Sequence, residues 1–115
     1  MTAPQTAQMQ QFGYTIPTLA LAVEPGTWEW QPLISRAVQG FASFDPGNGP
    51  STADFTCDVL VNGAAAFTIT VTNGDDEDIV TVSPAFVLHR GDLVNFQVTQ
   101  LGTATGPAEV GFGYF

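Results

Sequence analysis

Apolar and polar residues alternate along most of this chain, which is the pattern of β-strands that bury one face. Residues 54–62 place Phe, Cys, Val and Val at every second position, and residues 67–72 alternate apolar residues with threonines. Because successive side chains of a strand point to opposite faces, the pattern predicts two strands. The Asn62-Gly63 pair between them suits a turn with positive φ, so the two strands are predicted to form a β-hairpin.

Similar strand signals follow one another along the rest of the chain. They lie at residues 19–23, 27–30, 33–44, 55–61, 67–71, 80–82, 94–98 and 110–114. Turn residues separate them, most clearly the Pro- and Gly-rich run at residues 45–50, and no helical periodicity is sustained anywhere. About eight short strands predict an all-β protein, a single antiparallel β-sandwich of jelly-roll type. An immunoglobulin-type sandwich is less favoured because the Cys-Trp-Cys pattern is absent.

The chain of 115 residues is one domain by length. Residues 1–13 carry the run Gln8-Met9-Gln10-Gln11 and no charged side chain, a composition too polar to nucleate a core. We expect them to form a short polar N-terminal arm, either frayed or ordered against a neighbouring subunit. Residues 14–115 are then the sandwich domain.

The charge balance restricts the partners. Two basic residues, Arg36 and Arg90, stand against eleven acidic ones, giving a net charge of −9. Nucleic acids and anionic membranes are bound largely through Lys and Arg, so neither is an expected partner. The first 13 residues lack the basic and apolar regions of a secretory signal, and we expect synthesis in the cytoplasm of the producing cell.

The residue types that carry catalysis are sparse. His89 is the only histidine, and no nucleophile motif accompanies it and nearby Asp92. The acidic run at residues 75–78 follows its glycine, whereas an EF-hand places ligands at alternate positions around one; a solvated hairpin tip is favoured over a weak calcium site. Cys57 alternates with apolar residues and is predicted to be a buried thiol. We therefore expect no enzyme activity, no cofactor and no metal.

Aromatic residues and glycines supply the candidate contacts. Trp28 and Trp30 share one face of a predicted strand, as core residues, as subunit contacts or as a platform for sugar. Residues 111–115 form a strand with glycine on one face, which suits close approach of another backbone or aromatic surface. The candidate partner or subunit interface comprises Gln10, Gln11, Phe12, Trp28, Trp30 and Phe115.

The order of motifs also resembles a known family. Val59-Leu60-Val61-Asn62-Gly63, then the Thr-rich strand at residues 67–71, then the run from Gly91-Asp92 to Gln100-Leu101-Gly102 are similar to the compact β-modules of tailed-bacteriophage virion proteins. The resemblance covers roughly residues 33–115. It implies a jelly-roll-like sandwich, frequent assembly as a homotrimer, and a structural or binding role without catalytic residues.

Within that family the resemblance favours one role over another. In long fibres the module is one segment among several, whereas here it makes up nearly all of the chain. The expectation is a capsid decoration (cement) protein, made in the host cytoplasm and bound to the major capsid protein on the outer surface of the virion. The alternative is a tail- or head-fibre module that recognises a carbohydrate of the host surface.

Overall fold

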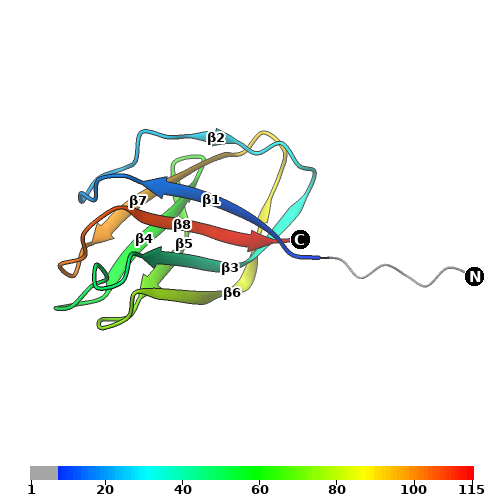
Figure 1. Ribbon diagram of the computed structural model, residues 1–115. Helices are drawn as coiled ribbons and strands as arrows, with labels where there is room; N and C mark the ends of the chain where they lie inside the picture. The colour runs from blue at the N-terminus through cyan, green and yellow to red at the C-terminus, as the bar shows by residue number, and fades with distance from the viewer. Residues whose placement is uncertain (1–7) are drawn as a thin grey trace, which may run out of the picture.

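The computed structural model describes residues 8–115, which form eight strands and no helix, so the described part holds no helix able to cross a membrane (Figure 1). The strands are β1 (Gln10–Ile16), β2 (Trp28–Glu29), β3 (Ser35–Phe44), β4 (Phe55–Val61), β5 (Ala64–Val71), β6 (Glu77–Leu88), β7 (Leu93–Gln100) and β8 (Ala108–Tyr114).

The strands pair like a long hairpin that has been rolled up. β4 pairs with β5, β3 with β6, β2 with β7 and β1 with β8, all antiparallel. Rolling brings β8 beside β3 and β7 beside β4, which completes two sheets of four strands, β1-β8-β3-β6 and β2-β7-β4-β5. This strand order is that of the jelly roll, and it confirms the predicted antiparallel β-sandwich.

The core lies between the two sheets. Its largest fully buried side chains include Phe55, Phe96 and Phe112, one or more from each sheet. Cys57 is fully buried beside them, and burial raises the pKa of its thiol to about 12. The thiolate is therefore not populated near neutral pH, as predicted for a buried cysteine.

The predicted hairpin at residues 58–71 is present as β4 and β5. Asn62 and Gly63 adopt φ values of 55° and 82°. Asn62 also joins this turn to the turn between β6 and β7. Its side-chain amide donates to Asp92 at 3.0 Å, and its side-chain oxygen accepts from the backbone N–H of Leu93 at 3.0 Å.

The N-terminal prediction needs correction. Gln10–Ile16 form β1 and pair with β8, so residues 10–13 belong to the sandwich and the arm predicted over residues 1–13 is too long. The reason is that Phe12 alternates with glutamine and glycine and still reaches the core, where its ring lies 5.3 Å from that of Phe112. Residues 1–7 of the predicted arm lie outside the described residues. The strand predicted at residues 19–23 is a loop with a single bridge from Val23 to Gln97.

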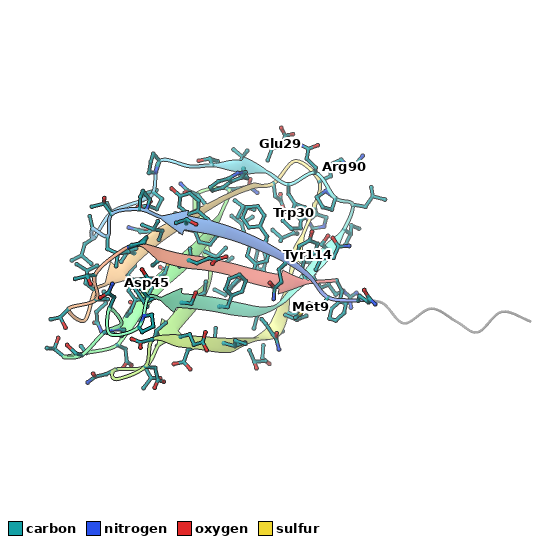
Figure 2. The ribbon with its side chains drawn as sticks, in the orientation of Figure 1. Met9, Glu29, Trp30, Asp45, Arg90 and Tyr114 are labelled. Carbon is teal, nitrogen blue, oxygen red and sulfur yellow. The ribbon has the colours of Figure 1, made fainter. Side chains whose placement is uncertain are left out.

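The two ends of the sandwich differ in charge. Four loops at one end carry Asp45, Asp54 and the acidic run, whereas Arg36 and Arg90 lie toward the end with the chain termini. Figure 2 shows Asp45 and Arg90 at these opposite ends. The net negative charge is therefore concentrated away from the termini.

Candidate functional site

The outward side of the β1-β8-β3-β6 sheet is the most distinctive surface of the molecule. Cross-strand register aligns its residues in rows, and the central row consists of Gly13, Gly111, Phe41 and Ile79 from β1, β8, β3 and β6. The next row toward the termini is Gln11, Gly113, Gln39 and Thr81. We call this surface, from the termini to the acidic loops, the glycine face.

Glycines on the central strand β8 allow large side chains to lie flat on this face. A Cβ atom on Gly111 would overlap the backbone carbonyl oxygen of Phe12 and come within 2.6 Å of the Phe41 ring, and one on Gly113 would come within 2.5 Å of the Met9 sulfur. A larger residue at position 113 would therefore displace the Met9 side chain, and one at position 111 would displace the backbone of β1 as well as the Phe41 ring. The close approach predicted from the glycines of residues 111–115 is present, and the approaching aromatic ring belongs to this same chain.

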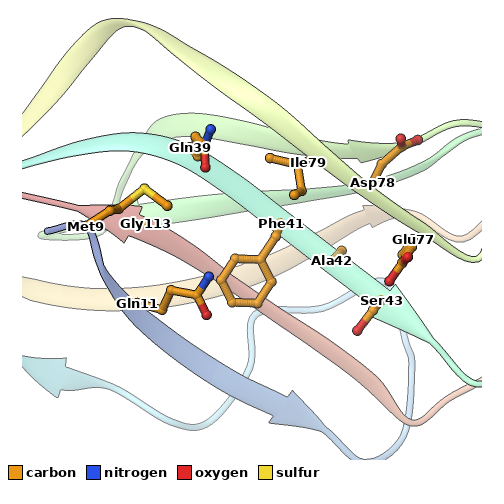
Figure 3. A pocket seen from close by; sticks show the side chains of 10 residues that line it. All are labelled: Met9, Gln11, Gln39, Phe41, Ala42, Ser43, Glu77, Asp78, Ile79 and Gly113. Atoms are coloured by element: carbon orange, nitrogen blue, oxygen red, sulfur yellow. The ribbon is translucent and has the colours of Figure 1, made fainter.

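A shallow hollow of about 460 Å³ crosses the glycine face (Figure 3). Met9, Phe41 and Ile79 supply its apolar lining, Gln11, Gln39 and Ser43 supply amides and a hydroxyl, and Glu77 and Asp78 supply carboxylates. Ile79, the third residue of β6, is 69% exposed, which is unusual for an isoleucine in a strand. An apolar floor with a few polar groups at its margins is the composition of a binding surface.

At the terminal end of the glycine face, an arginine lies between apolar residues. Arg36 and Phe115 exchange backbone hydrogen bonds of 2.9 and 3.0 Å, and Val87 is opposite Arg36 on the other side. Phe115 is 51% exposed, and Arg36 forms no ion pair with any residue of the described range 8–115. Arginine, methionine and aromatic residues are enriched at protein interfaces.

The outward side of the β2-β7-β4-β5 sheet, which we call the threonine face, is built differently. It consists mainly of threonine, asparagine, glutamine and aspartate side chains of β4, β5 and β7. The hydroxyls of Thr56 and Thr99 share a hydrogen bond of 2.6 Å, and Thr68 donates to Asp58 at 2.7 Å. These side chains satisfy one another or water, so this face has the character of a solvated surface.

The structure brings two of the predicted interface residues onto the glycine face. Gln11 and Phe115 lie there, whereas Gln10 accepts a hydrogen bond from the Tyr114 hydroxyl at 3.0 Å. Phe12 packs into the core. Gln11 is separated from Gln10 and Phe12 because neighbouring residues of β1 point to opposite faces of the sheet.

Trp28 and Trp30 lie in the interior and do not form a surface platform. Trp30 is 3% exposed, its indole N–H donates to Ser35 at 3.3 Å, and its ring is 4.7 Å from that of Tyr114 (Figure 2). Trp28 is half-buried and meets the ring of Tyr14 edge-on at 4.8 Å. Both indoles therefore serve the core, one of the interpretations that the sequence left open.

His89 and Asp92 form a turn. The backbone N–H of His89 donates to Asp92 at 2.8 Å, and this bond, followed by the one from Asn62, lowers the pKa of the Asp92 carboxyl. The imidazole Nδ1 is 3.8 Å from the same carboxylate, beyond hydrogen-bond distance. Asp92 thus braces the turn between β6 and β7.

The acidic run also has structural contacts. Asp76 accepts hydrogen bonds from the backbone N–H groups of Gly47 and Gly49, both at 3.1 Å, and Asp78 accepts from Thr72 at 2.9 Å. The nearby charge of Asp78, and then a hydrogen bond to it, raise the pKa of Asp75. Within residues 8–115 no group of three or more His, Cys, Asp and Glu side chains is arranged to hold a metal ion.

Sequence reasoning missed Phe41, Ile79 and Arg36 as surface residues. Relative to β8, a β-bulge between Ala37 and Gln39 inserts one extra residue into β3 and reverses which of its residues face outward. Without it, Phe41 would share the inward side with Ala37. The only available signal was the glycine at alternate positions of residues 111–115, which marks a close approach without naming its partner.

Comparison with protein-family models and with curated proteins finds no match to this chain. The assignment of function therefore depends on the geometry of the two outward faces and on the motif order.

Proposed function

We propose that this protein is a non-enzymatic capsid decoration protein, which binds the outer surface of a bacteriophage shell through the glycine face and stabilises the shell. The observation that carries the proposal is the apolar surface formed by Phe41 and the exposed Ile79 and Phe115, on a sheet whose counterpart has a mainly polar outward face in which Leu93 is the exposed large apolar residue of β7. An exposed apolar surface on one side of a small acidic protein marks a contact with another protein.

The charge distribution is compatible with this orientation. The two rows nearest the chain termini and the central row contain Arg36 as their charged residue, whereas the row nearest the acidic loops holds Glu109 and Glu77. The part of the face around Phe41 and Phe115 is therefore less expensive to desolvate than the row of acidic residues beside it. A net charge of −9 also keeps the protein apart from packaged nucleic acid.

Stabilisation of a shell does not require tight binding by each copy. A decoration protein adds contacts across the boundaries between shell subunits, and its binding stabilises the assembled state by mass action. Repetition over many equivalent sites increases the total effect without new chemistry. A single hollowed sheet face of modest area is sufficient for that role.

Cryo-microscopy of virions from the producing virus tests this proposal. We expect density for the jelly roll on the outer capsid surface, with Ile79 and Phe115 directed toward the major capsid protein and the Thr56–Thr99 pair toward solvent. Density confined to the tail, absence from the particle, or contact through the threonine face would each contradict it.

The hollow also supports a second candidate function, recognition of a host-surface carbohydrate by a fibre module. The ring of Phe41 and the amides of Gln11 and Gln39 line the same hollow, and ligand sites combine apolar or aromatic side chains with a few polar groups in this way. A glycan array tests it with Gln39→Ala and, as a control on the threonine face, Gln97→Ala. A signal lost only in Gln39→Ala supports this function, and a blank array for the unmodified protein counts against it.

A further inference from the structure

The four edge strands of the sandwich are protected to different extents. β2 has only two residues, and β6 contains Pro84 and begins with two acidic residues. β5 lies close to β6, which is the edge strand of the other sheet. β1 has seven residues, Gln10–Ile16, without charge, proline or bulge. Natural proteins avoid flat, neutral, exposed edges of this kind unless another strand pairs with them.

The outer edge of β1 has free backbone groups, and their positions follow from the ladder. Arg36 and Phe115 exchange both hydrogen bonds, so the backbone of Phe115 faces β3 and that of Tyr114 faces β1. Gln10 is opposite Tyr114 and therefore faces β8. Because neighbouring residues of a strand direct their backbone groups to opposite sides, the N–H and C=O groups of Gln11, Gly13 and Thr15 point away from β8, toward the open edge of the sheet.

No strand of the described chain pairs with this edge. None of the hydrogen bonds within residues 8–115 reaches the backbone of Gln11, Gly13 or Thr15. β2, the nearest edge of the opposite sheet, makes no close backbone contact with β1. The strand ends at Pro17, which has no N–H to donate.

We propose that β1 pairs with β1 of a second copy, antiparallel and centred on Gly13. A two-fold axis at Gly13 places Gln11 opposite the partner's Thr15, and Gly13 opposite the partner's Gly13. The backbone groups of Gln11, Gly13 and Thr15 in each copy then form hydrogen bonds with the other copy, about six across the junction. Gly13 supplies both its N–H and its C=O to the partner's Gly13 at the axis, so the pairing depends on its backbone.

The pairing has a consequence for the glycine face. Because β1 is the first strand of that sheet, the junction joins two glycine faces into one continuous surface twice as wide. A second copy also satisfies the symmetry that such a contact requires, since each strand presents the same residues to the other. The inference is independent of the proposed function, and it replaces the three-fold assembly that the motif resemblance implies with a two-fold one.

Sedimentation of the purified full-length protein over a range of concentrations tests the inference. We expect a reversible monomer–dimer equilibrium. Gln11→Lys with Thr15→Lys places like charges opposite each other at both ends of the junction and should weaken the dimer roughly tenfold. Gln11→Lys with Thr15→Glu places opposite charges at the same positions and should retain the dimer. The two variants differ at one side chain only.

A second pair of variants addresses the centre of the junction. Gly13→Pro removes an N–H that faces away from β8, so the strand should stay in its own sheet while dimerisation is lost. Gly13→Ala retains that N–H, and its Cβ would make only ordinary contacts with Glu109 at 3.5 Å and Phe41 at 3.8 Å. This variant should therefore still dimerise. Circular dichroism shows that each variant is folded. A monomer at every concentration, a trimer, or equal dimerisation of the two lysine-containing variants would overturn the inference.

Discussion

The glycine face and the threonine face are outward surfaces of two four-stranded sheets in one sandwich, yet their residues relate to one another in opposite ways. On the threonine face, polar side chains bond to their neighbours across the strands, as Thr68 does to Asp58. On the glycine face, Phe41 and Met9 cover glycines, and Ile79 remains exposed. The difference shows that alternation determines which residues face outward, whereas the types of those residues determine whether the face is polar and internally bonded or apolar and exposed.

The largest expected effect concerns the glycines beneath Phe41. Gly111→Val should lower the free energy of unfolding by about 3 kcal/mol, because the new side chain has no space between the Phe12 backbone carbonyl and the Phe41 ring. Gly13→Ala, in the same row, should stay within about 1 kcal/mol of the unmodified protein because its Cβ makes ordinary contacts. Urea unfolding of both variants measures the difference. Equal stability would show that the glycine face is not close-packed.

The polar pairs of the threonine face should give a smaller effect. We expect a double-mutant cycle of Asp58→Ala and Thr68→Ala to show a coupling of about 1 kcal/mol, because the pair forms a hydrogen bond to a charged group. The matched cycle on the glycine face, Gln11→Ala with Gln39→Ala, should show a coupling near zero. Comparable coupling on both faces would remove the distinction between them.

A still smaller effect should appear on acidification. The folded-state pKa of Asp92 is lowered by the His89 N–H and the Asn62 amide, so its stabilising contribution is present above the unfolded value of about 3.9. That contribution is lost as pH falls through the lower folded-state pKa. Asp92→Asn should reduce the acid dependence of unfolding, whereas Ile79→Ser should leave it unchanged. Parallel pH titrations of thermal unfolding measure both, and identical acid dependence in Asp92→Asn and the unmodified protein would contradict the assignment.

Much of the fold was predictable because it follows from period-two alternation. The hairpin at Asn62-Gly63 and five further strands depend on patterns that a single sequence displays. β1 was missed because the glutamines before Phe12 suggested a polar arm, although Phe12, Tyr14 and Ile16 alternate in the usual way. Their contribution depends on pairing with the far end of the chain at β8, which local sequence does not show.

The candidate site was less predictable than the fold. Whether Phe41 faces the core or the solvent depends on the bulge after Ala37, and a bulge adds one residue without a distinct sequence signal. Trp28 and Trp30, the most conspicuous aromatic residues in the sequence, lie in the interior. Aromatic character alone therefore does not show which aromatic residues lie on the outward faces, and for Phe41 the bulge in β3 decides it.

The central claim is that the glycine face is the docking surface, and one pair of variants tests it most directly. Ile79→Glu places a charge on the glycine face, and Thr70→Glu places the same charge on the threonine face, each at a position that the fold leaves accessible. Binding of each variant to capsids that lack this protein is measured by cosedimentation and by occupancy in cryo-microscopy. We expect Ile79→Glu to lose binding and Thr70→Glu to retain it; full binding by Ile79→Glu, or loss only in Thr70→Glu, would contradict the claim.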